Sequence, residues 1–254
     1  MIQRLLTIVA AAAVLASAAA PASAAPTPAP AATPAPPLRH LVYNFSYGVQ
    51  QTTSSRDSAN QASAAVGGSG ITHYNGSLND MGTMTVDIMG EQADKGLIVV
   101  ISEQGKDTRK APPATCVVYG NTTVLCDPNK TVNPEEYTLL RFLASNFIDP
   151  NKIDAKQHWN VNQAGAAMTI NADYTISKVD NNIMSIDESR SVRDKSAGQV
   201  TSDIQTKITY DYGRAVPNSI NEYVTQRVEG GVSGSATTIY QTSLQLVSDS
   251  LNKG

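Results

Sequence analysis

Few residues of this chain are of a type and spacing that could do chemistry. Its three histidines, His40, His73 and His158, have no second histidine or cysteine at the spacing of a zinc site. The segment nearest to a nucleophile elbow, residues 231–234 (GVSG), lacks the second glycine at the required place. The sequence therefore predicts a protein that is not an enzyme and holds no metal and no cofactor. A hydrolase whose site is assembled from distant residues is the alternative.

Cys116 and Cys126 predict a disulfide. The two cysteines are equidistant from Asn121, so a tight loop there makes them cross-strand partners. Facing Cα atoms lie about 4.5–5.5 Å apart, which is within reach of a disulfide. Two buried free thiols, or one reactive thiol, are the alternative. The spacing is not C-x-x-C, so we interpret the bond as a structural disulfide between the two strands of a hairpin and not as a redox site.

The first 24 residues have the pattern of an export signal. Arg4 gives a positive start, Leu5 to Val14 form an apolar stretch, and residues 22–24 (ASA) are an A-x-A cleavage site. A transmembrane anchor is the alternative, but spanning a membrane needs about 20 apolar residues. We expect cleavage near Ala24, a periplasmic or secreted product, and no membrane-spanning segment.

A Pro/Ala-rich linker follows at residues 25–37, and one β-rich domain is expected over residues 38–254. The whole chain has 19 basic and 22 acidic residues, so removing Arg4 leaves 18 against 22, a net charge of -4. An acidic surface cannot replace the counterions on phosphate, so no nucleic-acid partner is expected. A protein partner is left unidentified.

Alternation of apolar and polar residues dominates the chain from Leu38 onward and predicts antiparallel strands with one apolar face. Turn signals at residues 180–182, 195–198, 213 and 230–234 predict long strands of about 12 residues. Residues 104–113 carry charges and end in two prolines, so they are expected to form a loop.

One helix is predicted over residues 134–147. Asn133 can cap it, Pro134 fits its first position, and Glu135 and Glu136 complement the helix dipole. Its apolar face is formed by Leu139, Leu140, Leu143, Ala144 and Phe147, with Thr138, Arg141 and Ser145 on the opposite side.

The predicted apolar area of the strands exceeds what one helix can cover. About ten strands at about 4.8 Å spacing make a sheet close to 50 Å wide, whereas the helix is about 20 Å long. The fold class that follows is mainly β, a wide, curved antiparallel meander that forms an unclosed half-barrel with one covering helix. A two-sheet sandwich is the alternative, and insertion in an outer membrane is disfavoured because no aromatic girdles are evident.

This architecture resembles the bacterial periplasmic lipoprotein carriers, whose unclosed half-barrel with helical cover holds acyl chains. The resemblance rests on the signal peptide, the one-sided strands and the helix NPEEYTLLRFLASNF, and it extends over residues 38–250 as a pattern. No residue motif is shared, so no site residue is carried over.

The resemblance implies that the concave face binds lipid or another hydrophobic ligand in a non-enzymatic, exported protein. The alternative function is a structural or adhesion-type β module that binds another protein at the cell surface. The expected ligand-binding residues, which could instead pack as core, are Tyr43, Phe45, Met84, Trp159, Tyr174, Ile204, Tyr210 and Tyr240.

Overall fold

The computed structural model describes residues 36–56, 71–106, 110–120, 122–143, 154, 156–165, 168–194, 200–229 and 235–252. The predicted signal peptide, most of the linker, the turns at 195–198 and 230–234, and residues 144–147 of the predicted helix lie outside this range. The GVSG segment and the side chain of His73 also lie outside it.

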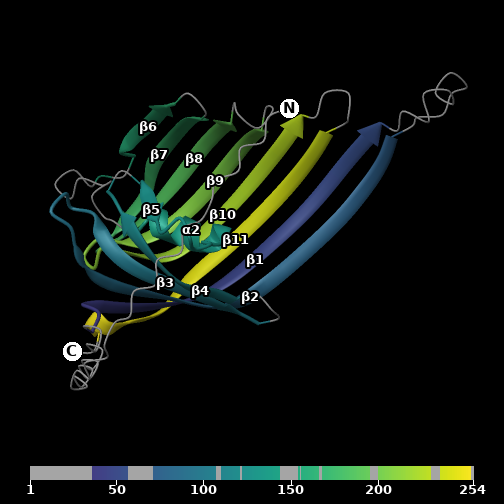
Figure 1. Ribbon diagram of the computed structural model, residues 1–254. Helices are drawn as coiled ribbons and strands as arrows, with labels where there is room; N and C mark the ends of the chain where they lie inside the picture. Colours follow the sequence, from purple (N-terminus) through teal and green to yellow (C-terminus); the bar gives the residue numbers. More distant parts are fainter. Residues whose placement is uncertain are drawn as a thin grey trace, which may run out of the picture. The chain divides into compact units, whose positions relative to one another are not determined.

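Eleven strands form one antiparallel sheet in the order β5-β4-β3-β2-β1-β11-β10-β9-β8-β7-β6. The sheet does not close, because β5 and β6 are its two ends, and it curves around helix α2 (Figure 1). The elements are β1 (Arg39–Arg56), β2 (Ile71–Glu91), β3 (Leu97–Gly105), β4 (Lys110–Val118), β5 (Val124–Cys126), α2 (Pro134–Arg141), β6 (His158–Ala164), β7 (Met168–Asp180), β8 (Ile183–Asp194), β9 (Val200–Asp211), β10 (Val216–Glu229), β11 (Ser235–Asp249) and the 3₁₀ turn η5 (Ser250–Asn252). The predicted fold class is confirmed, and the sandwich alternative is wrong.

The first and last strands of the domain pair with each other near the middle of the sheet. β1 pairs with β11 on one side and with β2 on the other, so the sheet is two meanders joined at β1 and β11. The Arg39 guanidinium binds the buried Asp249 carboxylate at 2.6 Å and donates to the Arg214 carbonyl at 2.8 Å. These contacts fix the junction at one end of the two strands.

Strand lengths agree with the turn signals, since β7 to β11 contain between 12 and 15 residues. The turn predictions at 180–182 and at 213 are confirmed. The loop predicted at 104–113 is wrong, because β4 begins at Lys110. Pro112 and Pro113 lie in β4 where its register with β3 is irregular, and there a missing N–H donor is tolerated.

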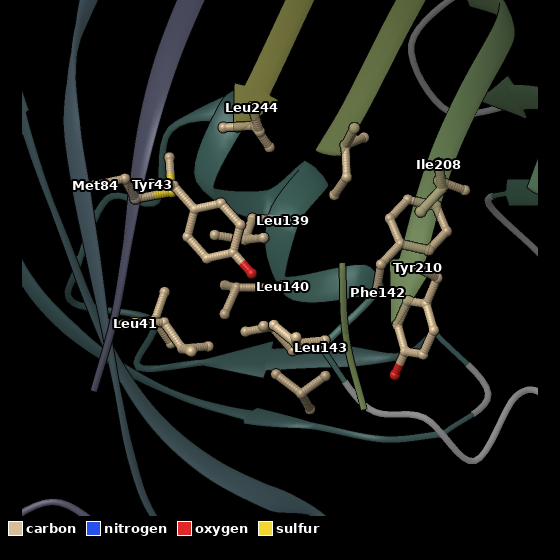
Figure 2. Packing of buried hydrophobic residues seen from close by; sticks show 14 of the residues in the cluster. Leu41, Tyr43, Met84, Leu139, Leu140, Phe142, Leu143, Ile208, Tyr210 and Leu244 are labelled. Atoms are coloured by element: carbon tan, nitrogen blue, oxygen red, sulfur yellow. The ribbon is translucent and has the colours of Figure 1, made fainter. Parts of the chain in front are cut away.

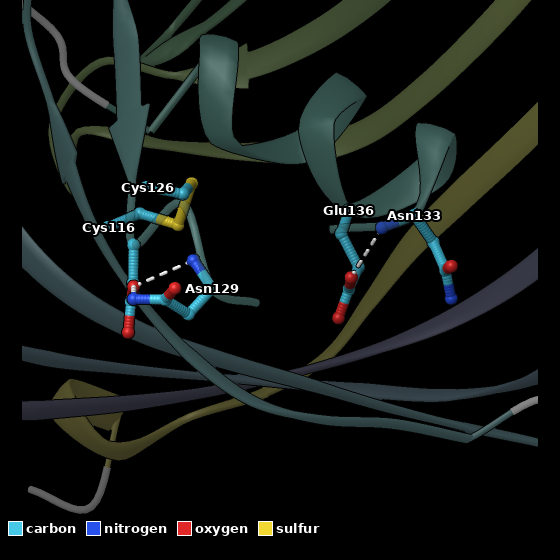
Figure 3. Close-up of a disulfide and its surroundings, with 6 residues drawn as sticks. Cys116, Cys126, Asn129, Asn133 and Glu136 are labelled. Carbon is cyan, nitrogen blue, oxygen red and sulfur yellow. Dashed lines mark hydrogen bonds between the residues drawn. A yellow bond between two sulfur atoms is a disulfide. The ribbon is translucent and has the colours of Figure 1, made fainter. Parts of the chain in front are cut away.

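Helix α2 begins where the sequence predicts. Pro134 is its first residue, and the Glu136 carboxylate accepts a 2.8 Å hydrogen bond from the Asn133 N–H (Figure 3). Figure 2 shows Leu139, Leu140 and the turn after the helix packed against the buried face of the sheet. Thr138 and Arg141, expected opposite the apolar face, are buried as well, because the helix lies within the curve of the sheet.

The predicted disulfide is confirmed. Cys116 of β4 and Cys126 of β5 are direct cross-strand partners with a Cα–Cα distance of 4.0 Å (Figure 3). The bond ties the short end strand β5 to the sheet.

Candidate functional site

The register of the strands arranges the concave face in rows that run across the sheet. Residues paired across successive ladders share one face, so each row can be followed from strand to strand. The row beside α2 is apolar and no more than 3% exposed, and we call it the core row: Phe45, Leu244, Ile220, Ile208, Ile186 and Ile176.

The next row along the strands is polar over most of its length. Its members, which we call the polar row, are Asp80, Tyr47, Thr242, Glu222, Thr206, Glu188, Tyr174 and Trp159. Apart from Glu222 and Trp159 they are at most 5% exposed. The indole of Trp159 stacks on the ring of Tyr174 with a centroid distance of 5.2 Å.

Arg141 of α2 binds two carboxylates of this polar row. Its Nη1 lies 3.0 Å from Glu188 Oε1, and its Nη2 binds Glu222. The Tyr174 hydroxyl donates to Glu188 Oε1 at 2.9 Å, and the Thr206 hydroxyl donates to Glu188 Oε2 at 2.6 Å. Both Glu188 oxygens are therefore engaged. The network attaches the helix to β8 and β10 through buried charge.

These contacts fix the protonation states of the network. Burial raises the pKa of Glu188, but the Arg141 charge and the hydrogen bond from the Thr206 hydroxyl together lower it by more than that. The pKa of Glu188 therefore lies below its usual value. Burial lowers the pKa of Arg141, but the two carboxylates raise it above its usual value. Burial and the Glu188 charge raise the pKa of Tyr174. At neutral pH Arg141 is therefore a guanidinium, Glu188 a carboxylate and Tyr174 a neutral phenol.

Beyond the polar row lies a second apolar row, which we call the distal row. Its members are Leu78, Val49, Tyr240, Val224, Ile204, Arg190, Ala172 and Val161. Leu78 is 52% exposed, and all the others except Ala172 are half-buried. Exposure therefore rises from the core row to the distal row across the polar row.

A cavity of about 90 Å³ adjoins one end of the distal row. Its walls come from the β4–β5 turn, β5, α2, β6, β7 and β8, and they include Arg190, Tyr137 and Thr122. The Arg190 Nε is buried and has no hydrogen-bond partner among the described residues. Burial, and then the neighbouring Arg141 charge, lower the pKa of Arg190.

A larger hollow of about 610 Å³ lies on the other side of the sheet. Its lining residues come from β1, β2, β9, β10 and β11 and include Gly48, Asn79, Gln241 and Tyr223. These four residues share a row on the outer face, since they are partners across successive ladders. Most of its lining belongs to this outer face, but Tyr47, Asp80, Glu222 and Thr242 of the polar row also line it.

All eight predicted ligand residues lie on the concave face, but at different depths. Ile204 and Tyr240 belong to the distal row, and Trp159 and Tyr174 belong to the polar row. The other four are at most 3% exposed and pack in the core: Tyr43, Phe45, Met84 and Tyr210.

The polar row and Arg190 were not identified from the sequence. A signal for them exists, because a polar residue interrupts the apolar positions of several successive strands, as in Ile204-Thr206-Ile208 and Ile220-Glu222-Val224. That these polar residues lie side by side in one row can be recognised only when the register between the strands is known.

Among the described residues, no three His, Cys, Asp or Glu side chains are grouped as a metal site would require. His40 Nδ1 lies 2.6 Å from Asp87, and His158 Nε2 lies 3.7 Å from Asp173, so the two histidines are on different strands with separate partners. No helix within the described ranges is long and apolar enough to span a membrane.

Comparisons with known proteins place the chain in no family. No protein-family model matches the sequence, and no curated protein matches it. A solved structure of lipid–protein interactions in lipovitellin is similar with a TM-score of 0.43 and 11% identity, covering 84% of this chain. The matched region is 25% of the length of the lipovitellin chain. The resemblance to the lipoprotein carriers stays a prediction.

Proposed function

We propose that this chain is an exported, non-enzymatic protein that binds a lipid or another hydrophobic ligand along the distal row. The observation that carries the proposal is the step in exposure on the concave face. The core row is at most 3% exposed, whereas the distal row apart from Ala172 is half-buried and ends in Leu78 at 52%. A disulfide between the two cysteines fits an exported protein.

The polar row lies between the buried core row and the half-buried distal row of the concave face. Glu188, Glu222 and Thr206, which bind Arg141 or each other, separate the core from the distal row. Covering the distal row would stabilise the bound state of a hydrophobic ligand, because burial of apolar surface contributes about 25 cal/mol of free energy per Å².

The dimensions of the distal row suit a lipid chain. Eight strands contribute to it, and seven spacings of about 4.8 Å give a row about 34 Å long. One acyl chain spans about 15 Å, half of the hydrocarbon core of a bilayer. The row is therefore long enough to hold an extended acyl chain against several strands.

The proposal is tested with the neutral apolar dye N-phenylnaphthylamine and with native mass spectrometry of the purified protein. We expect Leu78→Asp to weaken dye binding at least fivefold, because it places a charge in the distal row. Ser77→Asp is the matched control, since Ser77 is exposed on the opposite face of the same strand. Equal dye binding by the two variants, or no co-purifying ligand and no dye binding, would contradict the proposal.

The alternative function, binding of another protein, has one observation in its favour. β6 is an end strand of the sheet, so its outer edge has no partner strand among the described residues. An edge of this kind can accept a strand from another protein. A complex that is abolished by Asn162→Pro, together with no dye binding by the native chain, would favour this alternative.

A further inference from the structure

We propose that Arg190 binds the anionic headgroup of the hydrophobic ligand, so that the ligand is an amphiphile with a carboxylate or phosphate on an alkyl chain. The inference rests on the proposed function and deepens it, since it names the chemical class of the ligand.

The position of Arg190 is the first argument. It is the charged member of the otherwise apolar distal row, between Ile204 on β9 and Ala172 on β7. A guanidinium at such a position is costly to bury without a partner. Its Nε is buried without a hydrogen-bond partner among the described residues.

The neighbouring carboxylates do not supply that partner. Glu188 lies two residues away on the same face of β8, but Arg141, Tyr174 and Thr206 already bind its two oxygens. Glu222 is bound by Arg141 and by the Thr138 hydroxyl. The Glu188 charge therefore acts on Arg190 without a hydrogen bond between the two side chains, and the buried Arg190 Nε is left for another anion.

The cavity beside Arg190 supplies further donors and a direction for the tail. The hydroxyl-bearing residues Thr122, Thr123 and Tyr137 and the amide of Gln163 line it, and such groups donate to carboxylate and phosphate oxygens. From Arg190, the distal row continues over β9, β10, β11 and β1 to Leu78 on β2. These five strand spacings give the tail about 24 Å of apolar surface.

Trp159 provides a signal for binding at this site. It is the single tryptophan of the chain and stacks on Tyr174, which lines the cavity. Decanoate and decanol share the same ten-carbon chain and differ in the charged headgroup, and inorganic phosphate carries the charge without the chain. Titration of each probe into the purified protein, followed by Trp159 fluorescence, separates the contributions of head and tail.

We expect decanoate to bind at least tenfold more tightly than decanol. Arg190→Gln should abolish that preference by weakening decanoate binding at least tenfold. Arg227→Gln is the matched control, because Arg227 is an arginine whose side chain is 58% exposed, and it should keep the preference. The comparison of the two probes on the native chain needs no variant, so a folding defect of Arg190→Gln cannot obscure the result.

The outcomes distinguish this inference from the proposed function. Equal binding of decanoate and decanol, or an unchanged preference in Arg190→Gln, would overturn the role of Arg190 and leave hydrophobic binding intact. Phosphate binding as tight as that of decanoate would assign the cavity to a free anion and overturn the amphiphile. Absence of binding by either ten-carbon probe would contradict the proposed function itself.

Discussion

At the scale of single residues, Arg141 is the centre of a buried ion network. Arg141 joins α2 to Glu188 on β8 and to Glu222 on β10, and all three side chains are at most 8% exposed. Two carboxylates share one guanidinium there, so the desolvation cost is offset only while all partners are present.

Replacing Arg141 with methionine leaves Glu188 and Glu222 buried without their counterion. We expect the free energy of unfolding to fall by about 3–5 kcal/mol, measured by urea denaturation at neutral pH. Arg227→Met is the control, since the Arg227–Asp203 pair is 58% exposed on both sides and such pairs contribute about 0–1 kcal/mol. A loss no larger than that of the control would show that the network does not hold the helix.

At the scale of elements, close approach of strands β2 and β3 depends on a glycine. A Cβ at Gly82 would lie 2.1 Å from the Gln104 carbonyl oxygen and 2.8 Å from the Gly105 Cα. Both are backbone atoms of the paired strand, so they cannot move without disturbing the ladder. Gly90, on the same strand, has no atom within 4 Å of the position of its Cβ.

Gly82→Ala and Gly90→Ala form a matched pair. We expect Gly82→Ala to lower the free energy of unfolding by about 1–3 kcal/mol through overpacking, as measured by denaturant unfolding. Gly90→Ala should leave it unchanged or raise it by about 0.4–1 kcal/mol, because alanine restricts the unfolded chain. Similar effects of both substitutions would contradict the close approach of β2 and β3.

At the scale of the whole molecule, the pairing of β1 with β11 joins two meanders. Within each meander, the strands that pair are consecutive in the chain. β11 is hydrogen-bonded to β1 on one side and to β10 on the other. Its loss would leave no strand pairing between the five strands that end at β1 and the five strands that begin at β10.

A chain that ends at Glu229 lacks β11 and should therefore lose its cooperative unfolding transition, as followed by circular dichroism during heating. A chain that ends at Asp249 is the control. It keeps β11 and loses the hydrogen bonds from the His40 N–H to the Ser250 hydroxyl and from the Leu251 N–H to Asp249, and such bonds contribute about 0.5–1.5 kcal/mol each. A cooperative transition in the shorter chain would show that one meander folds alone.

The sequence by itself determined most of the strands, the start of the helix and the disulfide, but it predicted a loop where β4 begins. These features depend on near neighbours: alternation along each strand, Pro134 and Glu136 at the helix start, and the symmetric spacing of Cys116 and Cys126. The same alternation placed all eight predicted ligand residues on one face, because the period of a strand decides its face.

Only the tertiary structure decided the depth of each residue on that face. Ladder register aligned Glu188, Thr206 and Glu222 in one row, and the curve of the sheet buried Arg141 against them. Tyr43 and Tyr240 have the same pattern in the sequence, yet Tyr43 is buried and Tyr240 is half-buried. The physical reason is that burial depends on which distant strands and which helix lie opposite a residue, and periodicity along one strand carries no information about them.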